Sequence, residues 1–159
     1  MRNRRLLIAG LVALVVGTAG LALLAVFSTQ PAPVPAEGSG PSDGASIFLR
    51  GVAADGTPIR SRGGMRMRMS CAQCHGADGR GRRHQMFVTP DIRYRNLTDP
   101  AGMVEPDGSR GDTFTEAQVR NAIVAGVDAE GKPLAWPMPR WQLTQQQMDS
   151  LIAYLKALP

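Results

Sequence analysis

The longest apolar run of the chain lies near its amino terminus. Residues 6–27, LLIAGLVALVVGTAGLALLAVF, contain no charged side chain and follow Arg2, Arg4 and Arg5. A helix of this length crosses a hydrocarbon core of about 30 Å, since each residue adds about 1.5 Å. Basic residues before the run and none directly after it predict a cytoplasmic amino terminus. The pattern therefore predicts a signal anchor at 1–27, with one transmembrane helix at 6–27.

A cleaved signal peptide is the alternative, because the small residues of VPA, which end at Ala36, could be recognised by a signal peptidase. The apolar region of a cleaved signal usually has only about 7–15 residues. The longer run here favours an anchor that is retained.

Residues 28–43, STQPAPVPAEGSGPSD, are predicted to be a linker. They contain four prolines and two glycines and almost no large apolar side chain, so they cannot bury a core. Proline-rich chain is extended and would hold a domain away from the membrane. The folded domain is therefore predicted at 44–159.

Apolar spacing predicts three helices in that domain. Residues 44–51 have Ile47 and Phe48 on one side, with Ser42 or Asp43 as the cap. Residues 111–127 are expected to start after Thr115 and to stop at Gly126, with apolar positions at Ala117, Val119, Ile123 and Val124. Residues 143–159 are capped by Thr144, and their apolar positions i, i+3, i+4 and i+7 are Met148, Leu151, Ile152 and Leu155.

The segments between these helices are long and rich in Gly, Pro and Arg, with no repeat and no run of alternating strands. The predicted fold class is therefore all-α. Short helices joined by long loops bury little apolar surface, and only 5% of the residues are aromatic. A large buried apolar cofactor, wrapped by the loops, would complete the core.

Cysteine chemistry supplies a candidate for that cofactor. Cys71 and Cys74 are the only cysteines, and they lie in CAQCH with His75. A redox C-x-x-C pair is typical of a βαβ pattern, which this chain lacks. A structural zinc ion needs four ligands. The conventional candidates are Cys71, Cys74, His75 and His84, and a zinc ion bound by them would not stabilise most of the domain. C-x-x-C-H is also the sequence of covalent haem c attachment, in which two thiols join the vinyl groups and the histidine binds iron.

The second axial ligand of such a haem has several candidates. Pro137 and Pro139 frame Met138 in a stiff loop directly before the last helix, which favours Met138 as the distal iron ligand. Ligation by a histidine and a methionine raises the reduction potential of the haem relative to ligation by two nitrogen atoms. The alternatives are Met65, Met67, Met69, His84, Met86 and Met103, whereas Met148 belongs to the apolar face of the last helix.

These residues resemble a class I monohaem cytochrome c. GASIF resembles its first helix, where Gly44 and Phe48 would meet Tyr154, and CAQCHGADGRG resembles its attachment site. PDI (90–92) with NLT (96–98) resembles the strap below the haem, VRNAIVAG the middle helix, and MPRWQLTQQQMDSLIAYLKAL the distal methionine and last helix. The resemblance implies a cytochrome c fold around one covalent haem c, attached at Cys71 and Cys74 and ligated by His75 and Met138. Residues 51–70 are an insertion with no counterpart in the compact members of this family.

Function follows from the ligands. With both axial positions filled by protein, the haem passes electrons and binds no substrate. The prediction is a membrane-tethered, non-enzymatic electron carrier in a bacterial respiratory chain, a single-pass inner-membrane protein with its haem domain on the periplasmic side. The alternatives are a subunit of a larger oxidoreductase or oxidase, and a haem enzyme or gas sensor with an open sixth site.

Charge bears on the partner. The formal charge is +5, and arginines gather in 56–83 at Arg60, Arg62, Arg66, Arg68, Arg80, Arg82 and Arg83. Beside a haem edge they would steer an acidic surface of a redox partner protein. The alternatives are a solvated loop and arginines paired with haem propionates. Nucleic acid is an unsuitable partner for a domain outside the cytoplasm, and the protein is expected to be a monomer or a subunit of a complex.

Overall fold

The computed structural model describes residues 41–65 and 69–159. The predicted signal anchor at 1–27 and nearly all of the predicted linker lie outside the described residues. Within the described ranges, no helix combines the length and the apolar character needed to cross a membrane.

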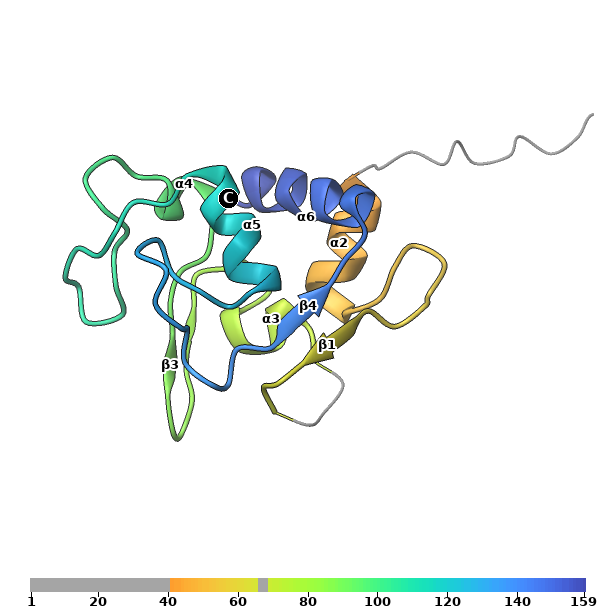
Figure 1. Cartoon of the computed structure of the whole chain (residues 1–159), viewed down its shortest axis with the longest axis horizontal. Helices are drawn as coiled ribbons and strands as arrows, with labels where there is room; N and C mark the ends of the chain where they lie inside the picture. Colours follow the sequence, from red (N-terminus) through yellow and green to blue (C-terminus); the bar gives the residue numbers. More distant parts are fainter. Residues whose placement is uncertain (1–40, 66–68) are drawn as a thin grey trace, which may run out of the picture. The chain divides into compact units, whose positions relative to one another are not determined.

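Two crossing helices form the frame of the domain, α2 (Pro41–Arg50) and α6 (Gln145–Ala157). They lie against each other in Figure 1, where α2 is orange and α6 is blue. Phe48 and Tyr154 meet across the crossing with their ring centroids 5.2 Å apart. Gly44 lies against the backbone of Ser150, so the expected contacts of Gly44 and Phe48 with the last helix are confirmed.

The start of α2 differs from the prediction. The helix begins at Pro41, three residues early, and proline is favoured at a first helical position. Ser42 and Asp43 are therefore inside the helix, and the prediction that one of them caps it is wrong. Oδ1 of Asp43 instead accepts a hydrogen bond from the backbone N–H of Ala54 at 2.8 Å, which ties the following loop to the helix.

The other two predicted helices have the expected caps. Helix α5 (Glu116–Val124) starts after Thr115, whose hydroxyl accepts a hydrogen bond from the N–H of Gln118 at 3.3 Å. Thr144 does the same for Gln147 at the start of α6, at 3.2 Å. Both glutamine side chains also accept from the backbone N–H of their threonine, at 2.8 and 2.9 Å, which completes a capping box.

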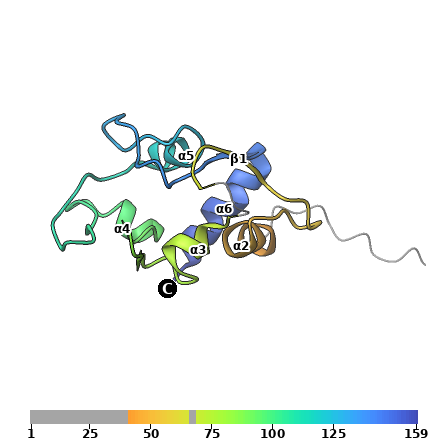
Figure 2. The same ribbon diagram turned by 90° about the horizontal axis from the view of Figure 1, so that it is seen from below.

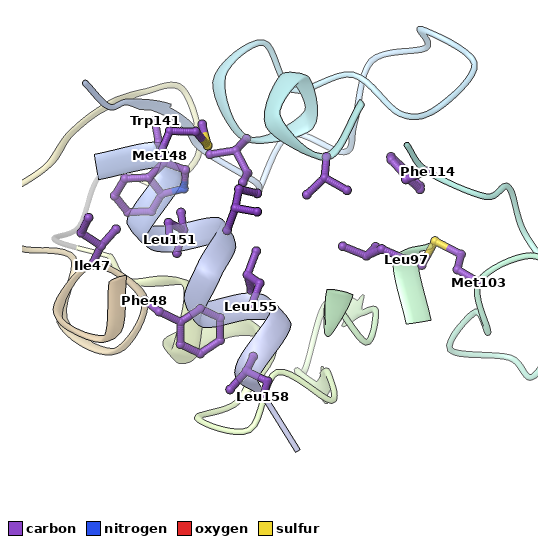
Figure 3. Close-up of a cluster of buried hydrophobic side chains, with 13 residues drawn as sticks. Ile47, Phe48, Leu97, Met103, Phe114, Trp141, Met148, Leu151, Leu155 and Leu158 are labelled. Atoms are coloured by element: carbon purple, nitrogen blue, oxygen red, sulfur yellow. The ribbon is translucent and has the colours of Figure 1, made fainter. Parts of the chain in front are cut away.

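Side chains of α2, α5 and α6 build the core shown in Figure 3. All four predicted apolar positions of α6 are buried, and so are Val119 and Ile123 of α5. The prediction fails at Ala117, which is exposed, and at Val124, which is 42% exposed. Leu97, Met103 and Phe114 form a second group that faces the α6 side chains in Figure 3.

Short elements complete the domain: α3 (Cys71–His75), α4 (Tyr94–Leu97), β1 (Arg60–Arg62), β2 (Arg82–Arg83), β3 (Val88–Thr89) and β4 (Arg140–Gln142). Strand β1 pairs antiparallel with β4, and β2 pairs antiparallel with β3. The all-α prediction is corrected to a mainly helical fold with two small ribbons. The strands escaped prediction because they are two or three residues long, and β1 and β2 carry only exposed side chains.

In the view of Figure 2, α5 and β1 lie in the upper part of the domain, and α3 and α4 lie in its lower part. Residues of both parts line a single cavity, so the fold brings segments that are distant in sequence to one site.

Candidate cofactor site

The main cavity of the domain has a volume of about 370 Å³, within the range of sites for small organic molecules. Its wall is predominantly apolar, with side chains that include Phe48, Phe87, Ile92, Leu97, Phe114, Val119, Ile123, Leu151 and Leu155. Cys71, Cys74, His75 and Met138 all line it. The four residues predicted to hold the cofactor are therefore brought to one cavity, from two segments of the chain.

Helix α3 presents three of these four residues. Ser70 precedes it, and the backbone N–H of Ser70 donates to the side chain of Gln73 at 2.9 Å, which fixes the first turn. Within one helical turn, positions three apart lie on the same face. Cys71 and Cys74 therefore both reach the cavity, and both are free thiols.

The surroundings of these thiols do not suit redox exchange or zinc. Burial raises the pKa of Cys71 to about 12 and also raises the pKa of Cys74. A cysteine that reacts by thiol–disulfide exchange needs the opposite shift of its pKa. No group of three metal-ligating side chains that could hold a metal ion occurs among the described residues, which include Cys71, Cys74, His75 and His84.

The imidazole of His75 is held by a backbone carbonyl. Its Nδ1 donates a hydrogen bond to the carbonyl of Pro90 at 3.0 Å, which leaves Nε2 with the lone pair. Burial lowers the pKa of His75, so the ring is neutral at pH 7. A histidine that binds a metal usually donates its other ring N–H to such a carbonyl. The segment of Pro90 was predicted to lie below the haem, but this bond could not be predicted, because every residue type has a backbone carbonyl.

The structure separates the candidates for a second ligand. Met138, Met69 and Met103 line the cavity, whereas Met86 is 86% exposed and Met148 is buried in the core outside the cavity wall. Met65 does not line the cavity, and Met67 lies outside the described residues.

The other histidine is engaged elsewhere. Nε2 of His84 donates to the carbonyl of Cys74 at 3.0 Å, and the ring of His84 stacks on Phe87 with the centroids 4.6 Å apart. His84 therefore supports the wall of the cavity from behind and does not line it.

The described charged side chains that line the cavity are carboxylates. Glu105, Asp112 and Asp128 line the cavity, and none of the described residues that line it is Lys or Arg. The arginines of 56–83 that the structure describes (Arg60, Arg62, Arg80, Arg82 and Arg83) are all exposed. Burial and the nearby charges of Asp107 and Asp112 raise the pKa of Glu105. These three carboxylates could not be picked out from the sequence, because they lie in loops that carry no regular pattern.

Comparison with known proteins adds one match. The model of the family described as Cytochrome c matches residues 62–159, which is more than half of the chain. No curated protein and no solved structure matches.

The residues in the cavity fit the cofactor of that family. Haem c is a flat apolar ring that is bound through two thioethers and an imidazole, and the cavity offers apolar walls, two thiols three positions apart and a neutral histidine with Nε2 free. Such a cofactor supports electron transfer. The chain belongs to the cytochrome c family and is a class I c-type cytochrome with covalently bound haem c.

Proposed function

We propose that this protein is a membrane-tethered carrier of single electrons, in which Cys71 and Cys74 bind the haem and His75 and Met138 are the axial ligands. The observation that supports this ligand set is the common cavity of all four residues, together with the bond that holds Nδ1 of His75 on the Pro90 carbonyl. His75 comes from α3 and Met138 from the loop before β4, so the chain approaches the cavity from two segments.

The haem supplies a reversible one-electron change at its iron. The protein contributes two things. The apolar wall of the cavity excludes water, and the two thiols keep the cofactor bound outside the cytoplasm. A thioether is a neutral, weak ligand and raises the reduction potential relative to a second nitrogen ligand. With both axial positions taken by protein, a substrate has no access to the iron, which is why we propose a carrier rather than an enzyme.

Replacement of Met138 tests this function. The Met138→Ala variant should lose the weak sulfur-to-iron band near the red end of the ferric spectrum, bind carbon monoxide rapidly when reduced, and have a lower potential. Met103→Ala is the matched control, because Met103 also lines the cavity and is 5% exposed. It should keep the band.

Met148→Ala is a control for stability. Met148 is 6% exposed and packs in the core outside the cavity, so its loss should cost about 2–5 kcal/mol of stability and leave the band in place. Loss of the band in Met103→Ala with retention in Met138→Ala would instead assign the distal ligand to the 100–110 loop. Rapid carbon monoxide binding by the unmodified protein would mean an open sixth site and would contradict a carrier.

Membrane attachment and the partner are part of the same proposal. The apolar run at 6–27 and its basic flank support an uncleaved anchor in the bacterial inner membrane, with the haem domain in the periplasm. The full chain should then sediment with membranes, and a soluble product that begins near Glu37 would contradict this. The exposed arginines support a redox partner with an acidic surface, whose association should weaken as salt is raised.

A further inference from the structure

The loop that carries Met138 has little structure of its own. We call residues 134–139 the distal loop. Its backbone makes one turn bond, from the N–H of Met138 to the carbonyl of Ala135 at 3.1 Å, and Leu134 N–H donates to Gly126 at 2.8 Å. Pro137 and Pro139 have no N–H to donate. The position of Met138 must therefore depend on groups outside the loop.

Arg140 supplies one set of such contacts. Its guanidinium donates to the carbonyl of Leu134 at 3.0 Å, to the carbonyl of Gly126 at 3.2 Å, and to the carbonyl of Met138 itself. These bonds join both parts of the distal loop to the end of α5. A Cβ atom at position 126 would lie 2.0 Å from Nε of Arg140, so glycine there leaves the space that the guanidinium occupies.

The insertion supplies contacts from another segment. Strand β1 pairs with β4, with Arg62 opposite Arg140 and Ser61 opposite Trp141. The chain then turns at Gly63 and Gly64, and Gly64 lies directly on the distal loop. A Cβ atom at position 64 would be 3.0 Å from Cβ of Pro139 and 3.1 Å from the carbonyl oxygen of Pro137.

We propose that Arg140 and Gly64 are positioning residues that hold the distal loop so that Met138 stays on the iron. This inference rests on the proposed role of Met138 as the distal ligand. The proposal assigns a role to the 51–70 insertion, because pairing of β1 with β4 places Gly64 against the two prolines that frame Met138. The distal ligand is then controlled by a segment that precedes the haem attachment site in sequence.

Adjacent glycines allow a matched test on the full-length holoprotein. Gly63 and Gly64 both have positive φ, 65° and 68°, but a Cβ at Gly63 would meet nothing within 4 Å. Asparagine tolerates this backbone conformation, so each variant carries a similar backbone cost. The added side chain of Gly64→Asn would overpack the contact with the distal loop. This variant should weaken the sulfur-to-iron band and accelerate carbon monoxide binding by roughly tenfold, which corresponds to a free-energy cost within the range usual for overpacking. Gly63→Asn should match the unmodified protein in both.

Arg140→Lys tests the other contact without removing the charge. A lysine lacks the planar fork that donates to several carbonyls at once, so this variant should also weaken the band and accelerate carbon monoxide binding. The spectra are recorded well below the melting temperature of each variant, because a merely structural role would lower that temperature and leave the band intact.

The outcomes separate the two proposals. If Met138→Ala keeps the band, Met138 is not the distal ligand and the proposed function fails. If Met138→Ala loses the band but Gly64→Asn and Arg140→Lys behave like Gly63→Asn in band intensity and carbon monoxide rate, the positioning proposal is overturned while the ligand assignment stands.

Discussion

At the scale of single residues, Glu116 has an unusual number of partners for a surface carboxylate. It accepts hydrogen bonds from Lys156 at 2.7 Å, from Arg120 at 2.9 Å and from the hydroxyl of Tyr94 at 3.2 Å. These partners belong to α6, α5 and α4, so one side chain links three helices. The bonds from Lys156 and then Arg120 lower the pKa of Glu116 to about 2.

The lowered pKa predicts a stability that depends on pH. The carboxylate is stabilised in the folded state, so its contribution is present above the ordinary pKa of 4.5 and is lost as the pH falls towards about 2. Glu116→Gln should cost about 1 kcal/mol near pH 6, because the side chain is partly exposed and screened. In melts at successive pH values, the difference from the unmodified protein should shrink between about pH 4.5 and pH 2.

Glu130→Gln is the control for this titration. Among the described residues, Glu130 forms an ion pair only with Lys132, two residues away in the same exposed loop, and it links no helices. Its replacement should change the melting temperature little at any pH. A constant difference between Glu116→Gln and the unmodified protein across the pH range would show that the carboxylate charge is not the cause.

That Cys71, Cys74 and His75 share one cavity could be predicted from the residue types, because the motif is local. C-x-x-C-H places two thiols and an imidazole within five consecutive residues, so their meeting in one cavity needs no knowledge of the rest of the fold. To predict that Met138 lies at the same cavity, the framing prolines were needed as an additional signal. The carbonyl of Pro90 and the guanidinium of Arg140 could not be predicted, because their roles depend on backbone positions that only the folded chain brings together.

At the scale of elements, the crossing of α2 and α6 depends on the glycine at position 44. A Cβ atom there would lie 2.0 Å from the backbone oxygen of Ser150 and 2.9 Å from Cβ of Tyr154. The first of these is a contact with backbone that cannot rotate away. The two helices approach as closely as they do because residue 44 has no side chain.

Gly44→Ala should therefore destabilise the domain although alanine favours helices. We expect a cost of about 1–3 kcal/mol from overpacking at the crossing, measured by denaturant unfolding of the holoprotein. Leu49→Ala, in the same helix at a position that is 41% exposed, should change stability by less than about 0.5 kcal/mol. Equal or greater stability of Gly44→Ala would mean that the helices can shift apart without loss.

Helices could be predicted where an N-cap residue was followed by apolar side chains at helical spacing. Thr115 and Thr144 each precede a glutamine at the third following position, and the α6 stripe has the period of a helix. The strands had neither signal. Strand β1 has the sequence Arg-Ser-Arg and is fully exposed. It forms because its backbone pairs with the distant strand β4, from Arg60 with Gln142 to Arg62 with Arg140. Such pairing is set by the tertiary fold rather than by local propensity.

At the scale of the whole molecule, the core and the cofactor cavity share side chains. Leu97, Phe114, Val119, Ile123, Leu151 and Leu155 belong to the buried core and also line the cavity. Side chains that face an unfilled space lose their packing partners on that side. The shortage of apolar burial in the sequence is thus explained by a core that is completed by haem.

This sharing predicts that the attachment cysteines are needed for the packing of the domain as well as for keeping the haem. In the Cys71→Ala, Cys74→Ala double variant, haem should be removed completely by an acid–acetone wash, because both thioethers are gone. The extracted protein should lose its near-ultraviolet circular dichroism and its cooperative thermal transition, while part of the helical signal remains. The unmodified protein, washed in the same way, should keep haem and both signals.

Haem that withstands the wash in the double variant would contradict attachment at Cys71 and Cys74. A cooperative transition in the haem-free double variant would show that the core packs without the cofactor.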